Sequence, residues 1–533
     1  MTVNALISAD TPLALYAGIL SFFTLAVVGF LSLRRERLPN AEFLRVVDKP
    51  GRGGQAEDVE AFMKNSLSTI MKGYNEYSKH GRHFLLRTPT QIYLMAPSTM
   101  LEEIRKIPDN KLSQPAAANI IFQIKHTFHL ALLNDYCHFD VVRKSLTQNL
   151  PRIIGDLACE TSYSFGAELG QCEDWTHAIV FQVCTALVTR VANRMMVGPE
   201  LCRNKDLLHY SATYTKATFD AAAMLRNVPA ILKPLVMRFN TSHRSQQEVA
   251  RRILVPVIRE RLSRMHPNTS SGDKQNKPND AHMSPSTPPN TAHGFRVSFK
   301  KRDPEILLQR MIHINVTAIH APAVTLAECI FDLCRHPEIH AELRDEIIQV
   351  LGNKAFDEAW SKANVDKLVK LDSFIRESTR LTPMSAVKME RLAVQDFKFS
   401  DGTFVPKGTS IGVISHGRHL DCDILPNATT FDAFRYAKVR AELGKEKQYT
   451  FAQAGPDNLL FGLGIHACPG RHFASVLLKI MLAHVLVCYD IRFIEGLSPP
   501  HGTWTQKFRN PDLGYAVSWK GRKVDTELQG AFL

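Results

Sequence analysis

Residues 461–471 read FGLGIHACPGR, a glycine-rich loop that carries a single cysteine, Cys468. Apolar residues recur behind this loop at helical spacing, which places the cysteine just before a helix N-terminus; they are Ala474, Leu477, Leu478, Met481, Leu482 and Val485. The free backbone N–H groups and the positive end of the helix dipole stabilise a thiolate there. Cys468 is therefore either a metal ligand or an ordinary buried cysteine, and the rest of the chain decides between the two.

The glycines of this loop favour a flat ligand. Gly470, which follows Pro469, lets the chain turn tightly and approach such a ligand without a side chain in the way, and Gly464 does the same upstream. Phe461 is placed to cover the sulfur. A sheltered, anionic sulfur suits an axial ligand of haem iron, to which it donates electron density.

Composition restricts the class of protein. The chain has 533 residues, is 45% hydrophobic and carries a formal net charge of +13, which is globular composition with a basic balance. Such a balance favours anionic membrane surfaces or acidic protein partners. The sequence lacks the basic and aromatic interleaving typical of nucleic-acid binding, so no nucleic-acid partner is expected. Ten scattered cysteines without a C-x-x-C pair predict neither a zinc site nor a disulfide framework.

The N-terminal region predicts a membrane anchor. Residues 13–33 form an uncharged run of 21 residues, long enough to span a bilayer as a helix, and arginines follow at once. Positive charge on that flank predicts a lumenal segment at 1–12 and a cytosolic remainder. We expect a linker at 34–60 and one catalytic domain at 61–533, with a disordered insertion at 266–294 that is rich in Pro, Ser, Thr and Asn. A buried core helix is the alternative for 13–33.

The rest of the chain predicts a mainly α fold with small β-sheets. Asp303 and Pro304 indicate the start of a long helix that ends near residue 336. Two more helices are expected at about 337–351 and 366–381. Strand patterns occur at 83–98, 489–493 and 515–519, and Asp401-Gly402 is the predicted turn of a hairpin.

Two further motifs accompany the cysteine loop. Glu377 and Arg380 lie at i and i+3 on one predicted helix, where their side chains can pair. Taken alone, this spacing is more typical of a solvated helix pair. The segment FDAFRY at 431–436 follows, and it contributes Arg435. All three elements occur in the order in which they occur in the cytochromes P-450.

The loop Phe461-x-x-Gly464-x-His466-x-Cys468-x-Gly470 resembles the haem-binding loop of the cytochromes P-450, especially fungal members, and Glu377-x-x-Arg380 resembles that family's E-x-x-R helix. The resemblance implies a cytochrome P-450 fold after one transmembrane helix, haem b with Cys468 as axial ligand, and a buried triad with Arg435.

The same resemblance implies residues that hold the haem propionates. His466 stands where the family usually has arginine, and it remains able to donate a hydrogen bond to a propionate. Arg143, in a helix like one that carries a propionate-binding arginine, is a second candidate. A surface charge is the alternative interpretation of Arg143.

The long helix departs from the family pattern over the oxygen-binding face of haem. Here it reads TAIHAP, with His320 at the acidic position and Ala321 at the position of a threonine that assists protonation. Pro322 has no N–H and leaves the carbonyl of Ala318 without its helical donor, so a kink is expected. A water held there by Thr317 and Thr325, one turn either side of Ala321, is one hypothesis. Simple tolerance of the proline, with a packed His320, is the other.

The resemblance implies a monooxygenase of the endoplasmic reticulum membrane that uses O2 and electrons from NADPH through a cytochrome reductase. An apolar substrate is expected: a terpenoid, meroterpenoid or indole-diterpene-like intermediate of fungal secondary metabolism. Oxidative coupling, ring formation or rearrangement is an alternative reaction, and a non-catalytic haem sensor is another alternative. By analogy with the family, the substrate-facing stretches are 112–135, 207–240, His313–Thr325 and Met384–Lys388.

Overall fold

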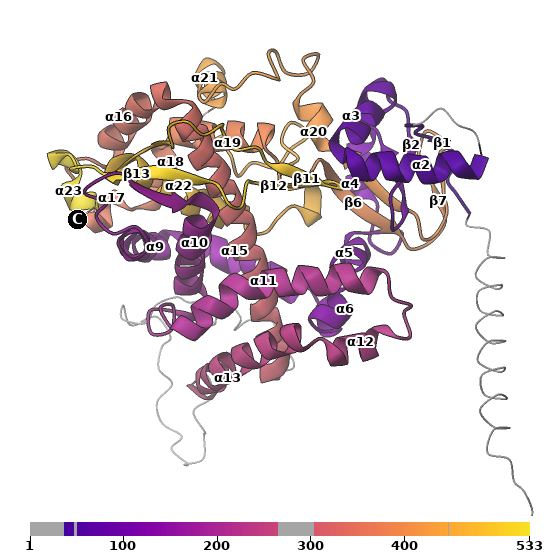
Figure 1. Ribbon diagram of the computed structural model, residues 1–533, viewed down its shortest axis with the longest axis horizontal. Helices are drawn as coiled ribbons and strands as arrows, with labels where there is room; N and C mark the ends of the chain where they lie inside the picture. The colour runs from indigo at the N-terminus through magenta and orange to yellow at the C-terminus, as the bar shows by residue number, and fades with distance from the viewer. Residues whose placement is uncertain (1–36, 47–50, 265–302, 446, 533) are drawn as a thin grey trace, which may run out of the picture.

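The computed structural model describes residues 37–46, 51–264, 303–445 and 447–532. The predicted anchor at 13–33 and the insertion at 266–294 lie outside these residues. Helices dominate the described parts, and the small sheets are spread across the molecule, with β13 (Ala516–Gly521) near one end and β1 (Glu42–Phe43), β2 (Phe84–Arg87), β6 (Val387–Ala393) and β7 (Phe397–Lys398) near the other (Figure 1).

The longer helices are α2 (Gly51–Lys64), α3 (Ser66–Glu76), α5 (Gln114–Phe122), α9 (Thr147–Glu168), α10 (Val180–Val197), α11 (Lys205–Arg226), α13 (Thr241–Arg264), α15 (Pro304–Arg335), α16 (His340–Leu351), α19 (Val369–Leu381), α21 (Arg435–Glu442) and α22 (Arg471–Cys488). The shorter ones are α4 (Leu101–Lys106), α6 (Ile124–Thr127), α7 (Ala131–Asn134), α8 (Cys137–Asp140), α12 (Lys233–Phe239), α17 (Phe356–Ala359), α18 (Lys362–Lys367), α20 (Ser415–His419) and α23 (Gln529–Phe532). A π-helix at Val141–Leu146 joins α8 to α9.

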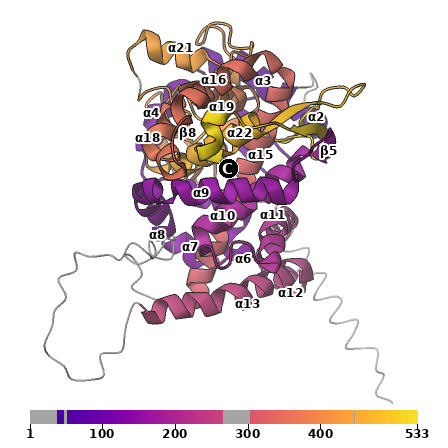
Figure 2. The same ribbon diagram turned by 90° about the vertical axis from the view of Figure 1, so that its left-hand side faces the viewer.

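Helix α15 is the centre of the fold. It runs through the middle of the molecule in both views and contacts α10, α11, α13, α19 and α22 (Figures 1 and 2). The predicted start is confirmed, because the Asp303 side chain accepts the Glu305 N–H at 2.9 Å and Pro304 occupies the first turn. Pro322 does not end the helix, which continues to Arg335, and the kink stays a prediction. Packing on both sides holds the proline turn helical, since Pro322 and Ala323 are buried.

The strands form four small sheets. Six strands pair in the order β1-β2-β3-β9-β6-β4: β1 (Glu42–Phe43), β2 (Phe84–Arg87), β3 (Ile92–Ala96), β9 (Ser410–Ile414), β6 (Val387–Ala393) and β4 (Leu112–Ser113). The others are β10 (Tyr489–Phe493), β13 (Ala516–Gly521) and β5 (Thr176–Ile179), the pair β11 (Thr503–Thr505) and β12 (Phe508–Asn510), and the hairpin β7 (Phe397–Lys398) and β8 (Phe404–Val405). Gly402 has φ +88° in the hairpin turn, as Asp401-Gly402 predicted.

The segment expected to be a linker, 34–60, is part of the folded body within its described residues. Strand β1 pairs with β2 in parallel, and α2 begins at Gly51. Leu44 is fully buried and packs with Phe62 and Phe84 in one cluster. The polar composition of this stretch concealed the two-residue strand β1, which depends on its pairing with β2, and the start of α2.

Within the described residues, α15 and α22 are the two helices that are long and apolar enough to cross a membrane. Both are largely buried inside the fold, with the central core cluster around them. They are therefore core helices. Their burial anchors α22 in the core, while the cysteine loop before it is partly buried and its Ile465 side chain is exposed.

Candidate functional site

The cysteine loop is closed by its own backbone. The Cys468 N–H donates to the Phe461 carbonyl at 2.7 Å, and the Arg471 guanidinium donates to the Cys468 carbonyl at 3.0 Å. Gly464 has φ +73°, and a Cβ there would lie 2.4 Å from Cγ of Arg105. Only glycine fits that position. Gly470, with φ −86°, has ordinary room for a Cβ beside Val142, so its backbone alone does not require glycine.

Cys468 lies just ahead of α22, as the helical spacing predicted. Burial raises the pKa of the Cys468 thiol, while the backbone N–H groups of Gly470 and Arg471 and the charges of Arg471 and Lys388 lower it. Burial is the largest of these effects. A thiolate at this depth therefore needs a cation at the sulfur, because a coordinating metal removes the thiol proton outright.

Three basic side chains lie beside the loop. The Arg143 guanidinium donates to the Ile465 carbonyl at 2.8 Å, and His466 Nε2 lies 3.1 Å from the Asp109 carboxylate. Burial lowers the pKa of His466, and the positive charges of Arg391 and Arg143 lower it further. The structure thus brings Arg143 and His466 together, as the sequence predicted, and it adds Arg391.

Arg391, on β6, was missed in the sequence. It is 4% exposed, and the one hydrogen bond of its side chain within the described residues goes to the Glu390 carbonyl at 2.8 Å. Burial lowers the pKa of Arg391 to about 10. A buried guanidinium whose remaining N–H groups have no partner suits a carboxylate ligand. The N–H donors beside Cys468 therefore fit a haem, which carries two propionate carboxylates. The sequence signal that could have identified Arg391 is its position on the strand that follows the E-x-x-R helix.

Glu377, Arg380 and Arg435 meet. Arg380 donates to both carboxylate oxygens of Glu377, at 2.8 and 2.7 Å, and Arg435 Nε donates at 3.2 Å. The backbone N–H of Asp432 adds a fourth bond at 3.1 Å. The Glu377 side chain is 0% exposed and that of Arg380 is 4% exposed. The carboxylate is thus fully paired in the interior, which the i, i+3 spacing alone did not establish.

The triad reaches the cysteine loop through His419. Arg380 Nη1 donates to the His419 carbonyl at 2.8 Å, and the Leu459 N–H lies 3.4 Å from His419 Nε2, two residues before Phe461. Because guanidinium bonds fix geometry, this chain of contacts restrains the entry to the loop.

Asp372 on α19 forms a second network, which the sequence did not reveal. Its carboxylate lies 2.9 Å from Lys479 of α22 and accepts the Phe451 N–H at 2.8 Å. All three residues are buried. This contact fixes α22, and with it the helix start behind Cys468, against α19.

The residues predicted on the oxygen-binding face lie along α15, and Thr317 is exposed although its helix crosses the centre of the fold. The Thr317 hydroxyl donates to the Ile314 carbonyl at 2.9 Å, and the Thr325 hydroxyl donates to the Ala321 carbonyl at 3.0 Å. The His320 ring contacts Phe219 and Phe181. Both hydroxyls thus bond to their own helix, and neither bonds to the carbonyl of Ala318.

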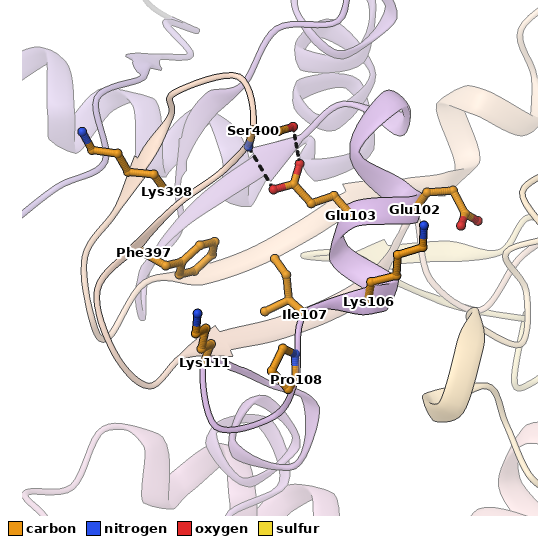
Figure 3. Close-up of a pocket in the computed structure, with 9 residues that line it drawn as sticks. All are labelled: Glu102, Glu103, Lys106, Ile107, Pro108, Lys111, Phe397, Lys398 and Ser400. Carbon is orange, nitrogen blue, oxygen red and sulfur yellow. Dashed lines mark hydrogen bonds between the residues drawn. The ribbon is translucent and has the colours of Figure 1, made fainter.

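A surface pocket of about 520 Å³ lies between α4 and the β7–β8 hairpin (Figure 3). Ile107 and Phe397 face into it, and the Glu103 carboxylate accepts the Ser400 N–H at 2.9 Å at its edge. None of the predicted site residues lines this pocket. It is therefore separate from the cysteine site.

The comparisons with known proteins agree with this geometry. The cytochrome P450 family model matches residues 143–519, and the chain belongs to the cytochrome P450 family. It is 32% identical over 468 residues to cytochrome P450 monooxygenase AN1598 of Emericella nidulans, an alignment covering 87% of this chain and 84% of that protein. It is 31% identical over 498 residues to cytochrome P450 monooxygenase hepE of Aspergillus oryzae, covering 91% and 86%.

The solved structure of retinoic acid-bound cyanobacterial CYP120A1 is similar in fold, with a TM-score of 0.64. The match covers 91% of this chain and 99% of that one at 14% identity. The protein is thus a cytochrome P450 monooxygenase with a mainly helical fold and small sheets. Its cofactor is haem b with a cysteine thiolate axial ligand, and its reaction requires O2 and a redox partner.

Proposed function

We propose that Cys468 is the axial thiolate of the haem and that the protein is a membrane-bound monooxygenase of fungal secondary metabolism. One observation carries this proposal: Cys468 lies in a glycine-shaped loop before α22, and buried ionic networks restrain that loop from both sides. When bound, the haem supplies the oxidation chemistry. The protein residues bind and orient the haem and the substrate and protect them from competing reactions.

Each protein group has a separate task in this proposal. Arg391 and Arg143 bind the carboxylates of the haem, and His466 lies close enough to assist when its bond to Asp109 opens. Glu377 and its arginine partners hold the approach to the loop. The N–H groups of Gly470 and Arg471 favour the anionic form of the Cys468 sulfur. Together they fix the sulfur in place, and a coordinating metal would keep it unprotonated.

The substrate is an apolar natural-product intermediate of terpenoid, meroterpenoid or indole-diterpene type. Supporting this, aromatic rings gather beside α15: Phe219 lies 5.7 Å from Phe122 of α5 and 5.6 Å from His320, measured between ring centroids. These residues fall within the predicted stretches 112–135, 207–240 and His313–Thr325. The segment Met384–Lys388 leads into β6, which carries Arg391.

The protein is proposed to lie in the endoplasmic reticulum membrane with its catalytic domain in the cytosol. The uncharged run at 13–33 supports an anchor. Large apolar side chains are also exposed on and just before α12: Ile231 is 87% exposed, Phe239 is 72% exposed and Leu235 is 53% exposed. Lys233 and Arg238 flank them. Basic residues beside exposed apolar ones suit contact with an anionic bilayer surface.

The electron donor is proposed to be the NADPH–cytochrome reductase of the same membrane. Supporting this, the net charge is +13, and Arg143 and Arg471 lie beside the cysteine loop. A basic face attracts an acidic partner and accelerates encounter.

The decisive experiment replaces the proposed ligand. Reduced wild-type protein under carbon monoxide is expected to show the red-shifted Soret band of a haem thiolate, and Cys468→Ser is expected to lose it. Cys488→Ser, at the far end of α22, is the matched control and is expected to keep the band. A Cys468→Ser protein with the unchanged band refutes the proposal. Feeding candidate intermediates to microsomes that contain the protein and a reductase, followed by mass spectrometry, identifies the substrate.

Ala321 favours a second reaction class. The chain has no hydroxyl at this position, and the nearby Thr317 and Thr325 hydroxyls bond to helix carbonyls. Oxidative coupling, ring closure or rearrangement has less need of proton delivery there. Product formation that does not depend on the reductase identifies a rearrangement, whereas incorporation of ¹⁸O from labelled O2 into the product identifies monooxygenation.

A further inference from the structure

A buried polar cluster on α8 and α15 has no part in the site described above. Arg310 of α15 is 2% exposed and His138 of α8 is 0% exposed. Arg310 Nη1 lies 2.7 Å from the Cys137 sulfur and 3.2 Å from His138 Nδ1, and Nη2 lies 3.0 Å from the Asp135 carboxylate. His138 Nε2 in turn lies 3.0 Å from Nδ1 of His313, on α15. The chain of contacts thus runs from Asp135 through Arg310 and His138 to His313.

The direction of these hydrogen bonds follows from Arg310. A guanidinium only donates, so His138 Nδ1 accepts. His138 is neutral, because burial and the charges around it lower its pKa to about 3, so its one proton lies on Nε2. That N–H donates to His313 Nδ1. Burial also lowers the pKa of His313 to about 4, and its single proton therefore lies on Nε2.

The His313 Nε2–H is left facing accessible space. Phe128 and Phe139 pack around the ring at centroid distances of 4.9 and 5.7 Å. No hydrogen bond joins Nε2 to another residue of the described ranges, and the atom is not sealed from solvent. His313 lies one turn before Thr317 and two turns before Ala321, on the same accessible face of α15.

We propose that His313 binds an oxygen atom of the substrate through this Nε2–H, so that the substrate is an apolar molecule bearing a hydrogen-bond-accepting carbonyl or hydroxyl oxygen. This inference rests on the proposed function, since it takes the α15 face near Ala321 as the place of oxidation. This N–H has no partner within the described residues, so it gains one when such an oxygen enters and is cut off from water without a partner when a hydrocarbon enters. Arg310 and His138 are positioning residues that fix the proton on the outward nitrogen.

The spacing also bounds the substrate. His313 precedes Ala321 by eight residues, which corresponds to roughly 12 Å along a helix at 1.5 Å per residue. The accepting oxygen and the oxidised carbon are therefore expected at opposite ends of a molecule of about that length. A fused-ring terpenoid has this size, and an earlier enzyme must have installed its oxygen, for example a hydroxylase or a ketone-forming dehydrogenase.

Skeleton-matched ligands test the proposal with the purified haem-loaded full-length chain. The probes are valencene and its ketone nootkatone, and 5α-androstane and 5α-androstan-17-one, each titrated by the change it causes in the ferric Soret spectrum. At least one ketone is expected to bind about tenfold more tightly than its hydrocarbon, as one hydrogen bond to a buried donor provides. His313→Phe keeps an aromatic ring in the site and is expected to reduce that ratio to about one, with the hydrocarbon dissociation constant within about twofold of wild type.

His313→Gln keeps an N–H donor and is expected to retain part of the preference. Every variant is first checked for the carbon monoxide band, so that loss of haem, which would count against the proposed function, is seen separately. Two binding results overturn the inference: neither ketone binds more tightly than its hydrocarbon, or His313→Phe keeps the preference. Unchanged ratios with less product per NADPH would assign His313 to proton delivery instead, and would also overturn it.

Discussion

Replacing Glu377 by Gln tests whether the buried triad holds the cysteine loop. The change keeps the shape of the side chain and removes its charge, leaving Arg380 and Arg435 facing an amide. Because the Glu377 side chain is 0% exposed, water cannot replace the lost carboxylate oxygen. Removing one partner of such a buried pair costs about 3–5 kcal/mol, or roughly a 100- to 5,000-fold change in the unfolding equilibrium.

The assay combines urea unfolding with the carbon monoxide spectrum. Glu377→Gln is expected to unfold at lower urea and to convert the thiolate band to an inactive form before global unfolding, because His419 links the triad to Leu459. Glu248→Gln is the matched control: it also sits at i, i+3 from an arginine, but its side chain is 65% exposed. Its loss is expected to be about 0–1 kcal/mol. Equal losses in the two variants would refute the reasoning.

Three further predictions follow from the site. Arg391→Leu is expected to release haem to apomyoglobin about tenfold faster than wild type, because a buried donor to a carboxylate is lost, whereas Arg492→Leu on the exposed side of β10 leaves the rate unchanged. Ala321→Thr is expected to leave product per NADPH within about twofold, since the nearby Thr325 hydroxyl already bonds to the helix; a large gain with the same product would contradict the view that the site is adapted as it stands. Burial lowers the pKa of His484 to about 4, so the stability due to its neutral form is complete above pH 6.5 and is lost as the pH falls toward 4. His484→Phe is expected to flatten the slope of unfolding free energy against pH by up to about 1.4 kcal/mol per unit in that range, measured by urea titrations at several pH values, and an unchanged slope would contradict it.

The sequence predicted those parts of the site that are local in the chain. The start of α15 follows from Asp303 and Pro304, and the place of Cys468 before α22 follows from the apolar spacing behind it. The spacing of Glu377 and Arg380 lies within one helix turn, so their contact was predictable as well. In each case the determining interactions lie within a few residues.

Parts that depend on tertiary packing were not predictable. The buried position of Arg391 depends on two tertiary features: the irregularity in β6 between Lys388 and Arg391, and the pairing of β6 with β9. Neither can be read from the sequence. The polar stretch before α2 gave no strand pattern, because β1 has two residues and depends on β2. Helix α15 continues past Pro322, and its contacts with neighbouring helices on several sides, which the sequence could not show, support it there.

The distribution of charge explains why these buried networks occur on one side of the site. Burial opposes a thiolate at Cys468, so the loop must be rigid enough that the sulfur cannot move away from its metal. Asp372 with Lys479, and Glu377 with Arg435, meet this need because each spans elements far apart in the chain. Such pairs add little net stability over apolar packing, but they allow one geometry only. On the α15 side an apolar substrate needs space rather than rigidity; there aromatic rings and one oriented N–H, that of His313, lie beside the Arg310–Asp135 ion pair.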